Sequence, residues 1–189
     1  MARERLLWAD AIKGVLALAV VFGHALQFGV AQPMEDYVWN FIYSVHMPAF
    51  FAVSGFLAFR PKDVSIKWKH VIIRRLQQLI IPFIVWSFID FITHSYNVDH
   101  LFAYVLYPDC MYWFLWTLFF ICLIFTTIDC LSRRISILVD IPIILTCLLL
   151  AGVMVACNIR VFGFQFIAYY FLFYSLGYFI KKYDLRVKN

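Results

Sequence analysis

Long apolar stretches separated by short polar segments dominate the chain and predict membrane-spanning helices. A helix needs about 17–25 apolar residues to cross the hydrocarbon core of a bilayer. Stretches of that kind lie approximately at residues 9–30, 39–59, 74–94, 112–129, 137–157 and 164–180. We therefore expect an all-α fold, a polytopic membrane helix bundle of about six transmembrane helices.

The composition agrees with this pattern. Hydrophobic residues make up 65% of the chain, charged residues only 14%, and the mean hydropathy is +0.84. A soluble domain of 189 residues could not cover so much apolar surface with polar side chains. No linker, repeat, low-complexity segment or signal-peptide cleavage pattern interrupts the chain, so we expect a single membrane domain over residues 1–189.

The basic residues indicate the topology. All but two of the 16 Lys and Arg residues lie in alternate polar segments: residues 3–5, 60–75, 133–134 and 181–188. The intervening segments carry Arg160 together with Glu35, Asp36, Asp99 and Asp109. By the positive-inside rule, both termini are expected in the cytoplasm. The net charge of +5 thus reflects topology, and no nucleic-acid partner is expected.

Lys13 and His24 lie on one face of the first predicted span. They are 11 residues apart, which is three helical turns plus about 20°, and this separates them by roughly 16 Å along the helix. Asp10 and Gln27 fall within about 60° of the same direction. A Lys or Asp at the bilayer centre costs about 2.5–3.5 kcal/mol. The stripe should therefore face protein or a wet cavity, and it is a candidate functional site.

His24 itself has two interpretations. A buried histidine can simply hydrogen-bond between helices. Alternatively it can act as a general base, because imidazole exchanges protons near neutral pH. The alignment with Lys13 favours the second interpretation.

A second candidate site begins at His46, within the motif Ser44-Val45-His46-Met47-Pro48. Pro48 removes a backbone donor and can kink the helix, which makes room for a ligand. Ser54 and Gly55, further along the same span, allow neighbouring helices to approach closely. For His46 a structural role and a functional role stay open, whereas packing alone is the simpler role for Ser54.

Arg74 and Arg75 begin the third predicted span. Such pairs often anchor the cytoplasmic end of a helix. The planar guanidinium group also suits phosphate oxygens, and Lys13 would add a positive charge at the same level. An anion-binding mouth about 16 Å from a histidine suits a long ligand with phosphates at one end. Coenzyme A is such a ligand.

Aromatic residues open the fourth predicted span, Tyr112-Trp113-Phe114-Leu115-Trp116. An aromatic belt at the membrane interface explains them most simply, and stacking of a sugar on Trp113 or Trp116 is the alternative. The sequence holds no metal-ligand cluster, no phosphate-binding glycine loop and no Gly-x-Ser-x-Gly motif. No metal is expected.

At these positions the chain resembles the acyltransferase-3 family of integral-membrane acyltransferases, particularly the fucose 4-O-acetylase-like branch. The resemblance rests on four segments in order: Trp8-x-Asp10-x-x-Lys13-Gly14 with Val20-Val21-Phe22-Gly23-His24; His46-Met47-Pro48-Ala49-Phe50-Phe51-x-x-Ser54-Gly55-Phe56-Leu57; Arg74-Arg75 with Pro82; and Trp113-Phe114-Leu115. They cover most of residues 8–120, whereas residues 130–189 match in hydropathy only.

The resemblance implies an enzyme that moves an acetyl group from acetyl-coenzyme A to a hydroxyl of a cell-surface or lipid-linked glycan. His24 would be catalytic, and Lys13, Arg74 and Arg75 would bind the coenzyme. Asp10, His46, Ser54 and Trp113 would support the site or bind the sugar acceptor. The expected location is the lipid bilayer of a bacterial inner membrane.

One departure from the family pattern is the length, since family members usually have about ten spans. The chain therefore resembles the N-terminal portion of a family member, which puts the activity of this chain alone in doubt. A non-catalytic remnant, a subunit that complements a partner or a second copy, and a small proton-coupled transporter are the alternatives. The transporter is the weakest, because no inverted repeat is visible.

Overall fold

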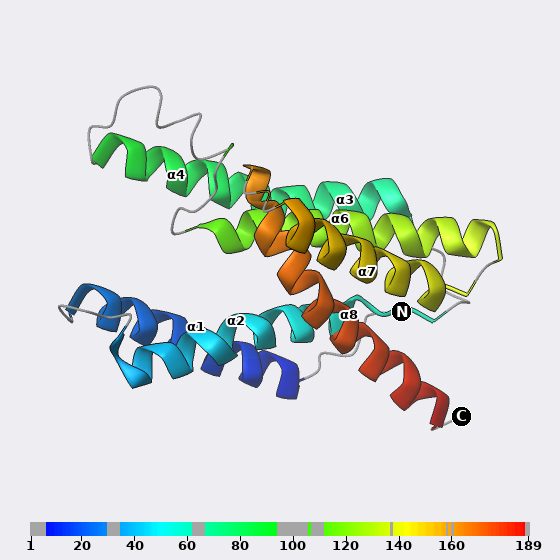
Figure 1. Ribbon diagram of the computed structural model, residues 1–189, viewed down its shortest axis with the longest axis horizontal. Helices are drawn as coiled ribbons and strands as arrows, with labels where there is room; N and C mark the ends of the chain where they lie inside the picture. The colour runs from blue at the N-terminus through cyan, green and yellow to red at the C-terminus, as the bar shows by residue number, and fades with distance from the viewer. Residues whose placement is uncertain are drawn as a thin grey trace. The chain divides into compact units, whose positions relative to one another are not determined.

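A computed structural model describes residues 7–29, 35–61, 67–93, 106, 112–136, 138–157, 159 and 161–187. Nine helical segments follow one another in this part of the chain (Figure 1): α1 (Leu7–Gly29), α2 (Tyr37–Ala58), α3 (Trp68–Arg75), η2 (Leu76–Ile80), α4 (Ile81–Thr93), α6 (Trp113–Arg134), α7 (Asp140–Cys157), η3 (Val161–Gly163) and α8 (Phe164–Val187). The described residues contain no strand. The all-α prediction is therefore confirmed.

The helices have the length and composition of membrane spans. Five described helices are long and apolar enough to cross a bilayer: Leu7–Gly29, Tyr37–Ala58, Trp68–Thr93, Trp113–Arg134 and Val161–Asp184. The helix α7 has 18 residues, which corresponds to about 27 Å of rise, close to the hydrocarbon thickness of about 30 Å. The protein is thus an integral membrane protein with a polytopic helix bundle.

Several helices extend further than the apolar stretches predict. The third span begins at Trp68 instead of residue 74, the fourth continues to Arg134 instead of residue 129, and α8 continues to Val187. The added turns carry basic residues. Lys and Arg are good helix formers, and their long side chains can keep the charge in water while the stem covers apolar surface. The apolar stretches alone therefore predict helices that are too short at these ends.

The helices group into two compact units, each described here by itself. The first unit comprises residues 1–59 and 173–189, and the second comprises residues 60–172. The helix α8 contributes its early turns to the second unit and its turns from Phe173 onward to the first. The prediction of one domain over the whole chain stays a prediction.

Two glycines allow a close contact between α2 and α8 in the first unit. A Cβ atom at Gly55 of α2 would lie 1.9 Å from the carbonyl oxygen of Tyr174 in α8, and one at Gly177 would lie 1.8 Å from the carbonyl oxygen of Ala52. Any side chain there would overlap the opposite backbone, so both positions require glycine. This is the small-residue packing common between membrane helices.

Helix α6 supplies much of the core of the second unit. Its residues Ile121 and Phe125 are buried, as are Phe83 of α4, Ile143 of α7 and Phe171 of α8. The rings of Phe125 and Phe171 lie 5.9 Å apart, and those of Phe83 and Trp116 lie 5.3 Å apart. Aromatic packing therefore connects α6 with α4 and with the early turns of α8.

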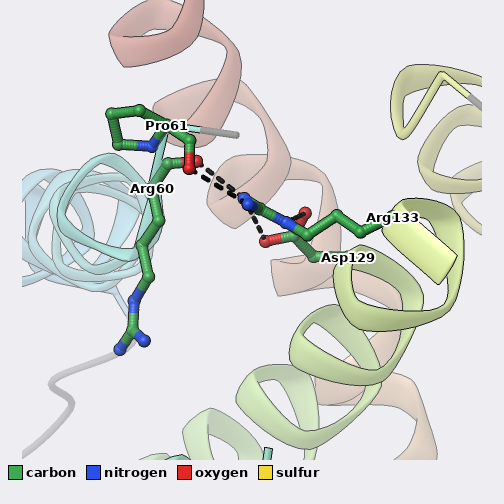
Figure 2. Close-up of polar contacts among 4 residues, drawn as sticks. All are labelled: Arg60, Pro61, Asp129 and Arg133. Atoms are coloured by element: carbon green, nitrogen blue, oxygen red, sulfur yellow. Dashed lines mark hydrogen bonds and ion pairs between the residues drawn. The ribbon is translucent and has the colours of Figure 1, made fainter. Parts of the chain in front are cut away.

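A charged cluster lies at the end of α6 (Figure 2). Arg133 donates from Nε to Oδ1 of Asp129 over 3.0 Å and from Nη2 to Oδ2 over 3.3 Å. The same guanidinium donates to the carbonyl oxygens of Arg60, at 2.7 Å, and Pro61, at 3.0 Å. Asp129 is buried. We call Arg133, Asp129 and these two carbonyl groups the arginine cluster.

The third span is one continuous helix with a wide turn in its middle. In η2 the N–H group of Ile81 bonds to the carbonyl group of Leu76, five residues earlier, instead of the usual four. Pro82 follows directly; it has no N–H group, and its ring conflicts with the carbonyl group of Gln78 in an α-helix. The wide π turn accommodates this proline, and it lies immediately after Arg74 and Arg75.

Candidate functional site

Three polar side chains meet between α1 and α2, which lie side by side in the first unit (Figure 1). The Tyr43 hydroxyl donates to Oε1 of Gln27 over 2.9 Å. Nδ1 of His24 lies 3.3 Å from the same Gln27 oxygen and 3.4 Å from the Tyr43 oxygen. We call His24, Gln27 and Tyr43 the histidine cluster.

The local sequence explains how this cluster forms. His24 and Gln27 are three residues apart, so they are neighbours on the surface of α1. Gly23 is buried, and a Cβ there would come within 3.0 Å of Cε2 of Tyr43. The absence of a side chain at Gly23 thus lets the Tyr43 ring lie against α1. Trp39, one turn earlier in α2, stacks on that ring at 4.2 Å and restrains it further.

The second candidate histidine lies against the same tyrosine. His46 is buried, and its Nδ1 is hydrogen-bonded to the carbonyl oxygen of Ile42 one turn earlier in α2. The Tyr43 ring meets His46 edge-on at 4.9 Å and His24 edge-on at 6.3 Å. Tyr43 therefore contacts both histidines. The burial of His46 and its bond to its own helix favour a structural role for this residue.

The other predicted polar residues lie in different places. In α1, Lys13 is half-buried and Asp10 is exposed. At the end of α3, Arg74 is exposed and Arg75 is half-buried. Lys13 belongs to the first unit and the arginine pair to the second. The expectation that all three bind one coenzyme stays a prediction.

Ser54 and Trp113 are both half-buried. Ser54 precedes the closely packed Gly55 in α2. The Trp113 ring stacks on Phe166 at 4.5 Å and on Tyr170 at 5.3 Å, both from α8. These stacked rings favour a packing role for Trp113, whereas sugar stacking on it stays a prediction.

Tyr43 is the residue that the sequence analysis missed. Gln27 was noted in the polar stripe, but no function was assigned to it. The available signal for Tyr43 is its spacing: it precedes His46 by three residues, so both share a face of α2. Among the described residues, no group of three or more His, Cys, Asp or Glu side chains is arranged to hold a metal ion.

Comparison with known proteins connects this site to a family. The acyltransferase-3 family model, which describes an acyltransferase domain, matches residues 6–189. Nodulation protein NolL of Sinorhizobium fredii (strain NBRC 101917 / NGR234) is 33% identical over 89 residues, 45% of this chain and 24% of that protein. Nodulation protein NolL of Mesorhizobium japonicum (strain LMG 29417 / CECT 9101 / MAFF 303099) is 31% identical over 81 residues, 41% of this chain and 21% of that protein.

The alignments thus span about a quarter or less of the length of these relatives. No solved structure matches the chain. The family model, by contrast, spans nearly all of the chain, including both units described above.

Proposed function

The chain belongs to the acyltransferase-3 family, and we propose on this basis that it is an integral-membrane O-acetyltransferase. It transfers an acetyl group from acetyl-coenzyme A to a hydroxyl of a cell-surface or lipid-linked glycan. The observation that carries the proposal is the histidine cluster: a histidine within a membrane span, hydrogen-bonded through one ring nitrogen to partners from two helices. Intramembrane ionisable groups held in this way are typical of functional sites.

The chemistry assigned to His24 is general base catalysis. Its free ring nitrogen removes the proton from the acceptor hydroxyl, whose oxygen attacks the thioester carbonyl carbon. The carbon–oxygen ester bond forms, the carbon–sulfur bond breaks, and the imidazolium returns its proton to the departing thiolate. An alternative with the same residue is transient acetylation of His24 followed by transfer to the hydroxyl.

The test is His24→Ala. Loss of a general base typically lowers the rate about 10²–10⁴-fold, so transfer of radiolabelled acetyl groups from acetyl-coenzyme A to isolated membrane glycan should fall by that factor. His70→Ala is the matched control, because His70 is an exposed histidine on α3. A His24→Ala protein that inserts correctly and still transfers acetyl groups within a few-fold of the wild-type rate would remove His24 from the chemistry.

For the donor site we propose that Lys13, Arg74 and Arg75 bind the coenzyme phosphates. The exposure of Arg74 and the position of the arginine pair at a basic end of the third span support this assignment. By the positive-inside rule this end faces the cytoplasm, where acetyl-coenzyme A is available. We propose the bacterial inner membrane as the location, with both chain termini on the cytoplasmic side where the donor is available.

Calorimetric titration with coenzyme A in detergent tests the donor site. Arg74→Ala or Arg75→Ala should raise the dissociation constant about ten- to hundredfold, since a charge-assisted hydrogen bond contributes about 1.5–3 kcal/mol. Arg→Lys should restore only part of the affinity, because a point charge does not reproduce the guanidinium fork. Arg134→Ala, an exposed arginine at the end of α6, is the control. Unchanged affinity in both pair variants would make the pair a topology anchor only.

A further inference from the structure

We infer that Gln27 and Tyr43 are positioning residues that hold the His24 ring as one tautomer, with the proton on Nδ1 and with Nε2 as the basic atom. The functional meaning of this inference rests on the function proposed above, because it assumes that His24 reacts. The tautomer itself is a property of the resting protein and does not depend on turnover.

The hydrogen-bond geometry determines which atom must carry the proton. The Tyr43 hydroxyl donates its single proton to Oε1 of Gln27 at 2.9 Å. An amide oxygen can only accept, so Nδ1 of His24, 3.3 Å from the same oxygen, has to be the donor of that contact. The Tyr43 hydroxyl already donates its only proton to Gln27, so its oxygen, 3.4 Å from Nδ1, can only accept a hydrogen bond from that nitrogen.

Both partners therefore present acceptor oxygens to the same ring nitrogen. A neutral imidazole has one donor nitrogen and one acceptor nitrogen. When Nδ1 is the donor, Nε2 carries the free lone pair. The same atom then serves whether the ring removes a proton from the acceptor hydroxyl or receives the acetyl group, so the inference holds for both routes described above.

The surroundings of Tyr43 restrain this arrangement. The ring is stacked on Trp39 at 4.2 Å and lies against the bare backbone of Gly23. Because Trp39 and Gly23 restrain the ring, the Tyr43 hydroxyl can direct the Gln27 side chain, and Gln27 in turn orients His24. Tyr43 thus acts on His24 mainly through Gln27.

The first experiment reads the tautomer directly. The full chain, labelled with ¹⁵N-histidine and placed in lipid nanodiscs, is compared with its His24→Gln variant, so that the missing signals identify the ring nitrogens of His24. We expect the protonated nitrogen to be Nδ1, recognised because the unprotonated nitrogen couples to both carbon-bound ring protons. A proton on Nε2 in the wild-type protein overturns the inference, whatever the activity of the chain.

The second experiment separates positioning from packing. Gln27→Leu should lower kcat about two- to tenfold with little change in KM, the scale of one hydrogen bond. Gln27→Glu should restore kcat, because a carboxylate also presents only acceptor oxygens to Nδ1. Tyr43→Phe should lower kcat by less than Gln27→Leu does, with Tyr37→Phe, an exposed tyrosine of the same helix, as the control.

If Gln27→Glu is as impaired as Gln27→Leu, the side chain at this position donates to Nδ1 and the inference is wrong. Failure of the proposed function looks different: there, His24→Ala retains activity while the ¹⁵N spectrum still shows the proton on Nδ1. The two measurements therefore distinguish a wrong tautomer from a wrong function.

Discussion

The two units hold their polar groups in different ways. In the second unit, the arginine cluster joins a guanidinium to a buried carboxylate and to two backbone carbonyls at 2.7–3.3 Å. In the first unit, the histidine cluster contains no carboxylate or guanidinium group, and two of its three contacts measure 3.3 and 3.4 Å. One cluster contains an ion pair, whereas the other contains none and is held mainly by longer contacts.

This difference fits a structural role for the arginine cluster and a chemical role for the histidine cluster. A buried charge is costly unless all its hydrogen bonds are made, so the arginine cluster is suited to fixing a segment in place. A reacting histidine must instead change its protonation state during turnover. In the first unit, the close backbone contact at Gly55 and Gly177 contributes rigidity, so the histidine cluster can orient the His24 ring without an ion pair.

Removal of Arg133 should have the largest effect on stability. Arg133→Ala leaves the Asp129 carboxylate buried without its cation, and breaking such a pair costs about 3–5 kcal/mol. Thermal unfolding in detergent should show a large drop in Tm. The control is Arg134→Ala, an exposed neighbour, for which a change within about 0.5 kcal/mol is expected. Equal melting of the two variants would contradict a structural role for the arginine cluster.

Gly55→Ala should have the next largest effect. The new Cβ would lie 1.9 Å from the Tyr174 carbonyl oxygen, so α2 and α8 must separate, and overpacking of this kind typically costs about 1–3 kcal/mol. In Gly14→Ala the added atom meets nothing within 4 Å and improves helix propensity. Comparing the two in the same unfolding assay isolates the helix contact. An unchanged Tm in Gly55→Ala would show that the first unit is not held by this contact.

Tyr43→Phe should have the smallest effect on stability, less than about 1 kcal/mol, because it removes one ordinary hydrogen bond and keeps the ring. Tyr37→Phe provides the baseline, since Tyr37 is 90% exposed. Both unfolding curves should nearly coincide with that of the wild type. A loss in Tyr43→Phe as large as in Arg133→Ala would mean that the histidine cluster is itself a structural element, and the contrast between the units would disappear.

Much of the fold could be predicted because membrane helices follow directly from hydropathy. The apolar stretches predicted the position of every described span. The polar stripe on the first span included Gln27 as well as His24. Tyr43 could not be placed in the same way, since its contact with His24 depends on how α1 packs against α2. The Tyr43 ring lies against Gly23, and in the sequence this glycine cannot be distinguished from other glycines of the predicted spans.

The arginine cluster was missed for a related reason. Arg133 lies in a basic segment, which the sequence analysis used only as a topology signal. Asp129 precedes it by four residues, a spacing that allows an ion pair on a helix. The carbonyl groups of Arg60 and Pro61, however, lie more than 70 residues away in the chain, and no periodicity connects backbone groups across that separation.

The π turn of the third span has a consequence for how this sequence can vary. A turn closed by a bond to the fifth preceding residue holds one residue more than an α turn, so it behaves as a single-residue insertion tolerated inside a helix. Deleting one residue from Leu76–Ile80 would remove this extra residue and let the turn close as an ordinary α turn, so the segments on its two sides would keep nearly the same directions. A one-residue deletion in the regular turns of α4 would instead rotate Arg74 and Arg75 by about 100° relative to the residues that follow the deletion. A one-residue gap placed in Leu76–Ile80 when homologous sequences are aligned is therefore compatible with an unchanged direction of the arginine pair, whereas a gap in α4 is not.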